Sequence, residues 1–191
     1  MYEILYANLQ GVLPSPRTVE RKLAKFEQPV VEGQIDAVGL KNYLTINKLP
    51  MIVSISEDAT AVIQRGEFDS IQNRLVGFSL PLNDNGLPDA NKSVITCVED
   101  IINMYTKMEK ASVVFVIMAQ PISDCVPPFR ICAFGSNNKF TTVDVQRRVA
   151  AVENQLSKVG IQMISYCTDG DSREMKFMRL RMNFGTTTNK G

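Results

Sequence analysis

The sequence contains no histidine, and its four cysteines (Cys97, Cys125, Cys132 and Cys167) show no CxxC spacing. Structural zinc sites use such residues in closely spaced pairs, so we expect neither a zinc finger nor another zinc site. The absence of histidine also excludes serine–histidine and cysteine–histidine catalysis. Carboxylates are therefore the main reactive groups that remain, and the cysteines are expected to be small core residues.

A long apolar run and a strong net charge are lacking as well. No apolar run approaches the length of a membrane span, and no signal peptide stands at the start. We therefore expect a nuclear or cytoplasmic protein with reduced thiols and no membrane contact. The 21 basic and 20 acidic residues leave a net charge of +1, so any DNA contact must come from a local patch.

The chain has 191 residues, of which 45% are hydrophobic and 21% charged, and these values are ordinary for a packed globular protein. The pattern predicts a helical segment over residues 1–49, with helices after Ser15-Pro16 and near residues 35–46. An α/β domain is expected over 50–184, followed by a disordered tail at 185–191.

The periodicity within 50–184 predicts strands, a hairpin and helices in a definite order. The first expected elements are a strand at 51–64 interrupted at 56–58, a hairpin turning at 70–73, and a helix at 98–107 with Val98, Ile101, Ile102 and Tyr105 on one face. A strand at 112–118 buried on both faces and a small strand at 130–134 follow. The last elements are a helix with Val145, Val149, Val152 and Leu156 inward, a buried strand at 161–167 and a final helix starting at Asp171 or Ser172.

Two short acidic stretches follow strand-like segments. Asp58 comes after the apolar run 51–55, and Asp169 and Asp171 come after 161–167. Ligands in sheet-based folds are held at strand ends, so Asp58 and Asp169 would share a divalent cation if their strands are neighbours. The alternative for Asp58 is an ordinary exposed acid, since most aspartates lie at the surface.

Asp169 and Asp171 have a structural alternative of their own. Asp171 or Ser172 can cap the final helix by accepting free backbone N–H groups, which would leave Asp169 available for a metal. Carboxylate oxygens suit Mg²⁺ or Mn²⁺, and two-metal phosphodiester chemistry requires several of them from different strands. Two aspartates are insufficient for that chemistry, so a third acid would have to complete the set.

Two basic stripes could contact phosphate groups. The first lies on the helix after Ser15-Pro16, where a solvated helix face is the simpler explanation. The second follows the proposed metal site, which makes it the better DNA-contact candidate. The members of the two stripes are Arg17, Arg21, Lys22 and Lys25, and then Arg173, Lys176, Arg179 and Arg181.

Three motifs together resemble a known family. They are LPSPRT at 13–18, then Asp58 followed by Phe68-Asp69 and by LVGF at 75–78, and finally TDGDSR at 168–173. They resemble eukaryotic transposases with an RNase H-like catalytic core, most nearly the P-element-like group that includes THAP-domain-linked members. The resemblance covers roughly residues 10–182.

The resemblance implies a partial RNase H-like mixed sheet preceded by a small helical segment. It also implies that Asp58 and Asp169 are catalytic metal ligands, with Asp171 as the alternative second acid. In such enzymes a third acid, usually Glu, lies much further along, whereas this sequence stops at Gly191. We therefore expect a fragment or domesticated remnant that does not cut or join DNA alone.

Two other functions compete with this one. The first is a non-catalytic module of transposon origin that binds DNA or protein, including a second copy or a related transposase chain. The second is an unrelated globular domain in which both acidic stretches are structural. A partial core would leave part of its sheet uncovered, which favours self-association or a partner.

Overall fold

The computed structural model describes residues 15, 17–18, 31–123 and 126–182. The chain divides into two units between Val30 and Val31, and the second unit carries all the elements below. They are α3 (Ala37–Ile46), β1 (Ile52–Ala61), β2 (Glu67–Asp69), β3 (Arg74–Val76), the 3-10 helix η1 (Ala90–Ser93), α4 (Val98–Lys107), β4 (Val113–Pro121), β5 (Phe129–Ser136), α5 (Thr142–Lys158), β6 (Gln162–Thr168) and α6 (Ser172–Arg181). The basic helix expected after Ser15-Pro16 and the tail at 185–191 lie largely or wholly outside the described residues.

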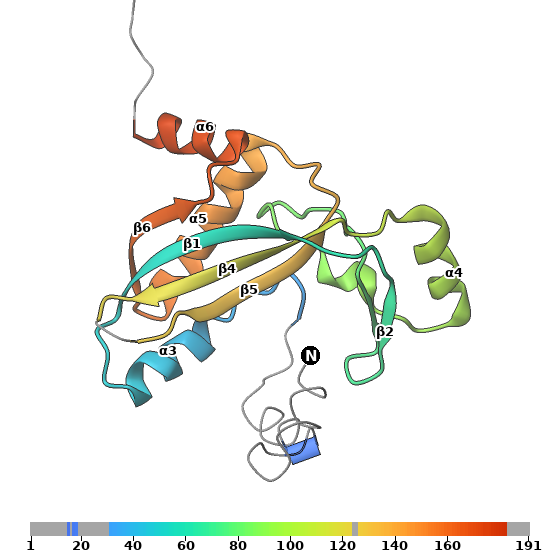
Figure 1. Cartoon of the computed structure of the whole chain (residues 1–191), viewed down its shortest axis with the longest axis horizontal. Helices are drawn as coiled ribbons and strands as arrows, with labels where there is room; N and C mark the ends of the chain where they lie inside the picture. The colour runs from blue at the N-terminus through green and yellow to red at the C-terminus, as the bar shows by residue number, and fades with distance from the viewer. Residues whose placement is uncertain (1–14, 16, 19–30, 124–125, 183–191) are drawn as a thin grey trace, which may run out of the picture. The chain divides into compact units, whose positions relative to one another are not determined.

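A four-stranded mixed sheet organises this unit, in the order β5-β4-β1-β6 (Figure 1). β4 pairs antiparallel with both β1 and β5, whereas β6 pairs parallel with β1. The parallel pairing requires a crossover, and α5 supplies it by passing behind the sheet. The α/β class is confirmed, and the segments at 51–64 and 161–167 are neighbours, which is the condition set for Asp58 and Asp169 to share an ion.

β1 is somewhat shorter than the strand expected at 51–64, but it is uninterrupted. The expected interruption at 56–58 is wrong, because the ladder to β4 continues through Asp58 opposite Val116 and reaches Ala61 opposite Val113. The polar run fits a strand because its side chains alternate between the faces. Ser56 and Asp58 are exposed on one face, and Glu57 is buried on the other.

β4 and β6 are less buried than their apolar sequences suggest. β4 alternates between buried and half-buried residues, so one of its faces packs in the core while the other is only partly covered. β6 has no buried residue. The expectation that both strands are buried on both faces is therefore wrong, because a run of apolar residues does not reveal which faces of the sheet are covered by helices.

The core lies between the sheet and its helices. The face of α5 expected to point inward does so, because Val145, Val149, Val152 and Leu156 are buried. A reciprocal capping box between Thr141 and Asp144 starts α5. Chain direction reverses after the helix at Gly160, whose φ of 82° favours glycine.

α3 belongs to the same core, which sets the boundary of the domain. Leu40 and Leu44 are fully buried against the sheet. The preceding segment covers the outer edge of β5, where Gly33 N–H donates to Ala133 O and Asp36 N–H donates to Ile131 O. The compact unit therefore starts at Val31, whereas the sequence placed the start of the α/β domain at residue 50.

The hairpin β2–β3 and α4 form a smaller apolar cluster to one side of the sheet (Figure 1). The turn expected at 70–73 is present, with Asp69 accepting the N–H groups of Ile71 and Gln72. α4 packs on this cluster through the buried Met104 and the half-buried Ile101, whereas Val98, Ile102 and Tyr105 of the expected apolar face are exposed.

The cysteines match the expectation only in part. Cys132 is buried, and burial raises the pKa of its thiol to about 12. Cys97 and Cys167 are exposed, so they are not core residues. No helix among the described residues is long and apolar enough to cross a membrane.

Candidate metal and nucleic-acid site

Asp58 lies inside β1 rather than beyond its end. Asp58 pairs with Val116 of β4, and its side chain is on the exposed face of the strand. One carboxylate oxygen accepts the N–H of the next residue, Ala59, at 2.8 Å. The other oxygen has no hydrogen bond among the described residues, so this acid can accept an additional ligand.

Asp169 is the first residue after β6. Its Oδ1 accepts the N–H of Asp171 at 3.2 Å and the hydroxyl of Thr168 at 3.4 Å. In the parallel ladder Glu57 stands opposite Thr168, so the next residues on the two strands are Asp58 and Asp169. The register thus places Asp58, within β1, level with Asp169, which lies just beyond the end of β6.

Asp171 is occupied by the start of α6. It is the N-cap residue, with its Oδ1 accepting the N–H of Arg173 at 2.8 Å. The side chain of Arg173 also binds it, at 2.9 Å to Oδ1 and 2.7 Å to Oδ2. These bonds lower the pKa of the Asp171 carboxyl to about 2, and the capping role explains its place in the sequence.

Arg173 is held in place rather than free for DNA. Besides Asp171, its guanidinium donates at 2.7 Å to the backbone and to the side chain of Asn138, and it lies 3.6 Å from the centre of the Phe140 ring. The pairing with Asp171 raises the pKa of Arg173. Its role is to tie α6 to the loop before α5, whereas Lys176 and Arg179 point to solvent.

The described residues contain no group of three or more acids, cysteines or histidines that could hold a metal. Asp58 and Asp169 therefore form at most a two-acid site within this part of the chain. Such a pair can bind a hard cation weakly, with water completing the coordination.

A buried ion pair on the opposite face of β1 was not anticipated from the sequence. Glu57 of β1 and Arg148 of α5 are both almost fully buried, and two bonds join them, Nη2 to Oε1 at 2.5 Å and Nε to Oε2 at 3.0 Å. Tyr166 of β6 donates its hydroxyl to Glu57 Oε2 at 3.0 Å. This network links three elements through one carboxylate.

Aromatic rings and a loop surround Arg148. The guanidinium carbon lies 5.4–5.6 Å from the ring centres of Phe115, Phe134 and Phe140. Its Nη1 donates to the carbonyl of Gly86 at 3.3 Å. Gly86 has a φ of 67°, and a Cβ there would lie 2.2 Å from the carbonyl oxygen of Asp144, so glycine permits this close approach.

A sequence signal for this network exists. Arg148 stands among the inward valines of α5, and Glu57 has the same strand parity as the buried Ile55. Charged residues at inward positions of two elements indicate a buried pair.

Glu174 of α6 is a second buried acid near this network. It is 2% exposed, and no hydrogen bond reaches its side chain from the described residues. Burial, and next the negative charge of Glu57, raise its pKa to about 8, against the opposing effect of Arg148. The carboxyl is therefore largely protonated at neutral pH.

No known protein family and no curated protein matches the sequence. The structure is similar to a chain of the Drosophila P element transposase strand transfer complex, with a TM-score of 0.50 and 13% identity. The match covers 94% of this chain and 31% of the transposase chain. At this identity the likeness concerns the fold, and the chain has a transposase-like α/β fold built on a four-stranded mixed sheet.

Proposed function

We propose that this chain is a transposase-derived domain with an RNase H-like sheet, which binds DNA in the nucleus and does not cut it alone. The proposal depends on one observation, the parallel pairing of β1 and β6 with Glu57 opposite Thr168. That register makes Asp58 and Asp169 the next residues on neighbouring strands. The fold likeness to the P element complex supports the transposase origin.

Asp58 and Asp169 are the proposed ligands of one Mg²⁺ or Mn²⁺ ion. Both are exposed, and neither carries an ion pair among the described residues. Asp171 is the weaker candidate because its two oxygens already bind the helix start and Arg173. A phosphodiester transfer through two ions needs at least one further acid, so we expect binding without strand cleavage.

Metal binding tests the proposed pair of ligands. Asp58→Asn and Asp169→Asn should each weaken Mn²⁺ binding by about tenfold, because each removes a charged oxygen ligand. Free and bound Mn²⁺ can be measured by electron paramagnetic resonance. Asp84→Asn is the matched control, since Asp84 is an exposed acid in the loop before η1.

Equal Mn²⁺ affinity in all three variants would show that the two acids do not share an ion.

The same preparations, mixed with labelled duplex DNA and Mg²⁺ or Mn²⁺, should leave the duplex intact. Robust nicking that Asp58→Ala abolishes would contradict the proposed lack of activity.

DNA contact is proposed to come from the exposed cations of α6, Lys176 and Arg179. The Lys176→Ala/Arg179→Ala variant should weaken binding to any duplex and reduce the salt dependence of log K by about 0.9 per lost phosphate contact. A fluorescence-anisotropy titration at several salt concentrations measures both effects. Lys41→Ala/Lys107→Ala removes two exposed lysines from α3 and α4 and serves as the control.

The same titration distinguishes a DNA-binding domain from a module that binds only protein. A wild-type chain that binds no DNA at low salt would remove the nucleic-acid part of the proposal. Equal losses of DNA affinity in the two double variants would show that the DNA contact does not lie on α6.

A further inference from the structure

The backbone ladder between β1 and β6 does not by itself fix the position of Asp169. Among the described residues β6 pairs only with β1, and its register to β1 shifts between Met163 and Ser165. The last pair of the ladder joins Glu57 and Thr168, so Asp169 lies one residue beyond it. Burial adds little, because no residue of β6 is buried and a register is strongly specified only where one face is buried.

A side-chain hydrogen bond on the covered face of the sheet adds a second constraint. Tyr166 stands opposite the buried Ile55, so it shares a face with Glu57. The Tyr166 hydroxyl donates to Glu57 Oε2 at 3.0 Å. A slip of β6 by one residue would turn Tyr166 to the opposite face and break this bond. The bond therefore favours the observed register over its neighbours.

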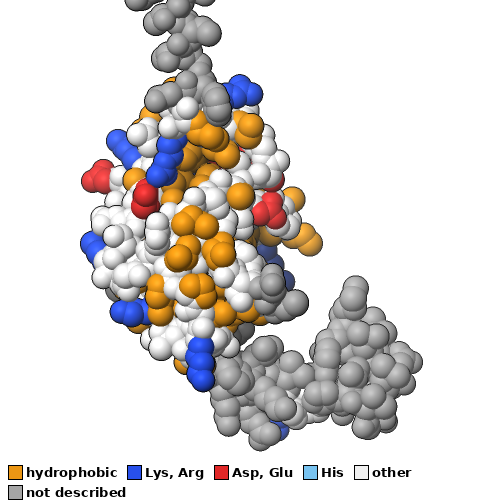
Figure 2. Space-filling model, turned by 90° about the vertical axis from the view of Figure 1, so that its left-hand side faces the viewer, with side chains coloured by type: hydrophobic (Ala, Val, Ile, Leu, Met, Phe, Trp, Pro, Cys, Tyr) orange, Lys and Arg blue, Asp and Glu red, His pale blue; other side chains and the backbone are white. Residues whose placement is uncertain are grey.

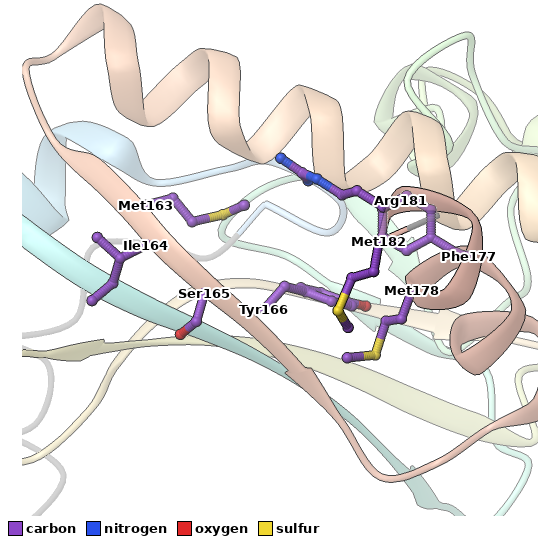
Figure 3. Close-up of a pocket in the computed structure, with 8 residues that line it drawn as sticks. All are labelled: Met163, Ile164, Ser165, Tyr166, Phe177, Met178, Arg181 and Met182. Carbon is purple, nitrogen blue, oxygen red and sulfur yellow. The ribbon is translucent and has the colours of Figure 1, made fainter. Parts of the chain in front are cut away.

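Both ends of this bond are held by helices. The Glu57 carboxylate is 2% exposed and receives two hydrogen bonds from Arg148 of α5. The Tyr166 ring packs edge-on against Phe177 of α6, with the ring centres 6.1 Å apart. Figure 3 shows Tyr166 on the side of β6 that faces α6, with Ser165 on the other side. Tyr166 thus ties β6 to β1 and α6, and through Glu57 to α5.

The surroundings of the bond are largely apolar. A band of apolar side chains runs down the side of the molecule on which β6 lies (Figure 2). Burial, and next the charge of Glu57, raise the pKa of the Tyr166 hydroxyl, so this group remains a donor in alkaline solution. A hydrogen bond to a carboxylate is stronger in such surroundings than in water.

We propose that Tyr166 is a positioning residue for the Asp58–Asp169 pair, an inference that rests on the proposed metal binding by these two acids. Glu57 directly precedes Asp58, and Tyr166 lies three residues before Asp169 on the neighbouring strand. The Tyr166–Glu57 bond holds the two strands level where the acids stand. Supporting contacts of this kind determine how well two ligands can share an ion.

Tyr166→Phe tests this role, because it removes the hydroxyl and leaves the ring packed on Phe177. Mn²⁺ binding, measured by electron paramagnetic resonance, should weaken by about threefold, which is less than on removal of a ligand because both acids remain. Tyr105→Phe is the matched control, since the Tyr105 hydroxyl donates to the Gly66 carbonyl at 3.0 Å and the ring packs edge-on against Phe78. This control should leave the Mn²⁺ affinity unchanged.

The Asp169→Asn background separates positioning from a general loss of structure. Tyr166→Phe should have no further effect on the Mn²⁺ affinity there, because the ligand that it positions is gone. A wild-type Mn²⁺ affinity in Tyr166→Phe, or an equal loss in the Asp169→Asn background, overturns the positioning role and leaves the proposed metal site intact. A wild-type affinity in both Asp58→Asn and Asp169→Asn would instead contradict the metal site, and the positioning role with it.

A second measurement needs no metal. Amide hydrogen exchange in residues 165–168 should be at least about threefold faster in Tyr166→Phe than in wild type, because β6 is held less firmly, while exchange in α4 should not change. Equal exchange in residues 165–168 of the two proteins would show that the hydroxyl does not hold β6 in place. That result overturns the proposal even if the Mn²⁺ affinity falls.

Discussion

Arg148→Met is expected to lower the free energy of unfolding by about 3–5 kcal/mol, because it leaves the buried Glu57 carboxylate without its partner. The loss also removes the guanidinium from the three phenylalanine rings and frees the Gly86 carbonyl. Urea unfolding followed by far-UV circular dichroism measures the effect. Arg147→Met is the matched control, since Arg147 is the exposed neighbour on the same helix.

The double variant Glu57→Leu/Arg148→Met separates the charge from the packing. Removing both charges leaves an apolar pair at a buried position, so much of the lost stability should return. Similar losses of unfolding free energy in Arg148→Met and Arg147→Met would show that the Glu57–Arg148 ion pair is not buried.

Glu174→Gln is expected to stabilise the fold in alkaline solution and to have no effect in acid. The folded-state pKa of Glu174, about 8, lies above the ordinary value of 4.5, so the folded chain retains a proton that the unfolded chain releases. Stability therefore falls as pH rises from about 4.5 to about 8, and the full penalty remains above that range. Glutamine cannot ionise, so the variant should gain about 2–5 kcal/mol near pH 9.

The groups that surround Glu174 determine this expectation. Glu57, Asp171 and Asp169 disfavour its ionisation, and Arg148 favours it. Unfolding curves at several pH values, with Glu99→Gln on the exposed surface of α4 as control, measure the difference. A Glu174→Gln gain that is equal at pH 5 and about pH 9 would contradict the burial of an ionisable group.

The elements that the sequence predicted best are those set by local periodicity and caps. The inward face of α5 follows from valines at helical spacing, and Thr141 and Gly160 mark its two ends. The turn at 70–73 follows from Asp69 and its neighbours. Such features depend on residues close in the chain, which the sequence displays directly.

The errors concern which surfaces meet. Three of the four residues of the expected apolar face of α4 are exposed, β6 has no buried residue, and α3 packs in the core of the sheet domain. Arg173, which the sequence offered as a DNA contact, joins Asp171 to Asn138, and the sequence did not reveal this role. In each case a distant part of the chain determines the environment, and periodicity carries no information about it.

The sequence by itself determined the α/β class, the helix α5 and the cap of α6 at Asp171. Only the tertiary structure decided that β6 pairs beside β1, that Asp171 is taken by Arg173, and that Glu57 and Arg148 meet in the core. The reason is physical: helices and turns are stabilised by neighbours within a few residues, whereas a sheet register and a buried ion pair join residues up to about a hundred positions apart.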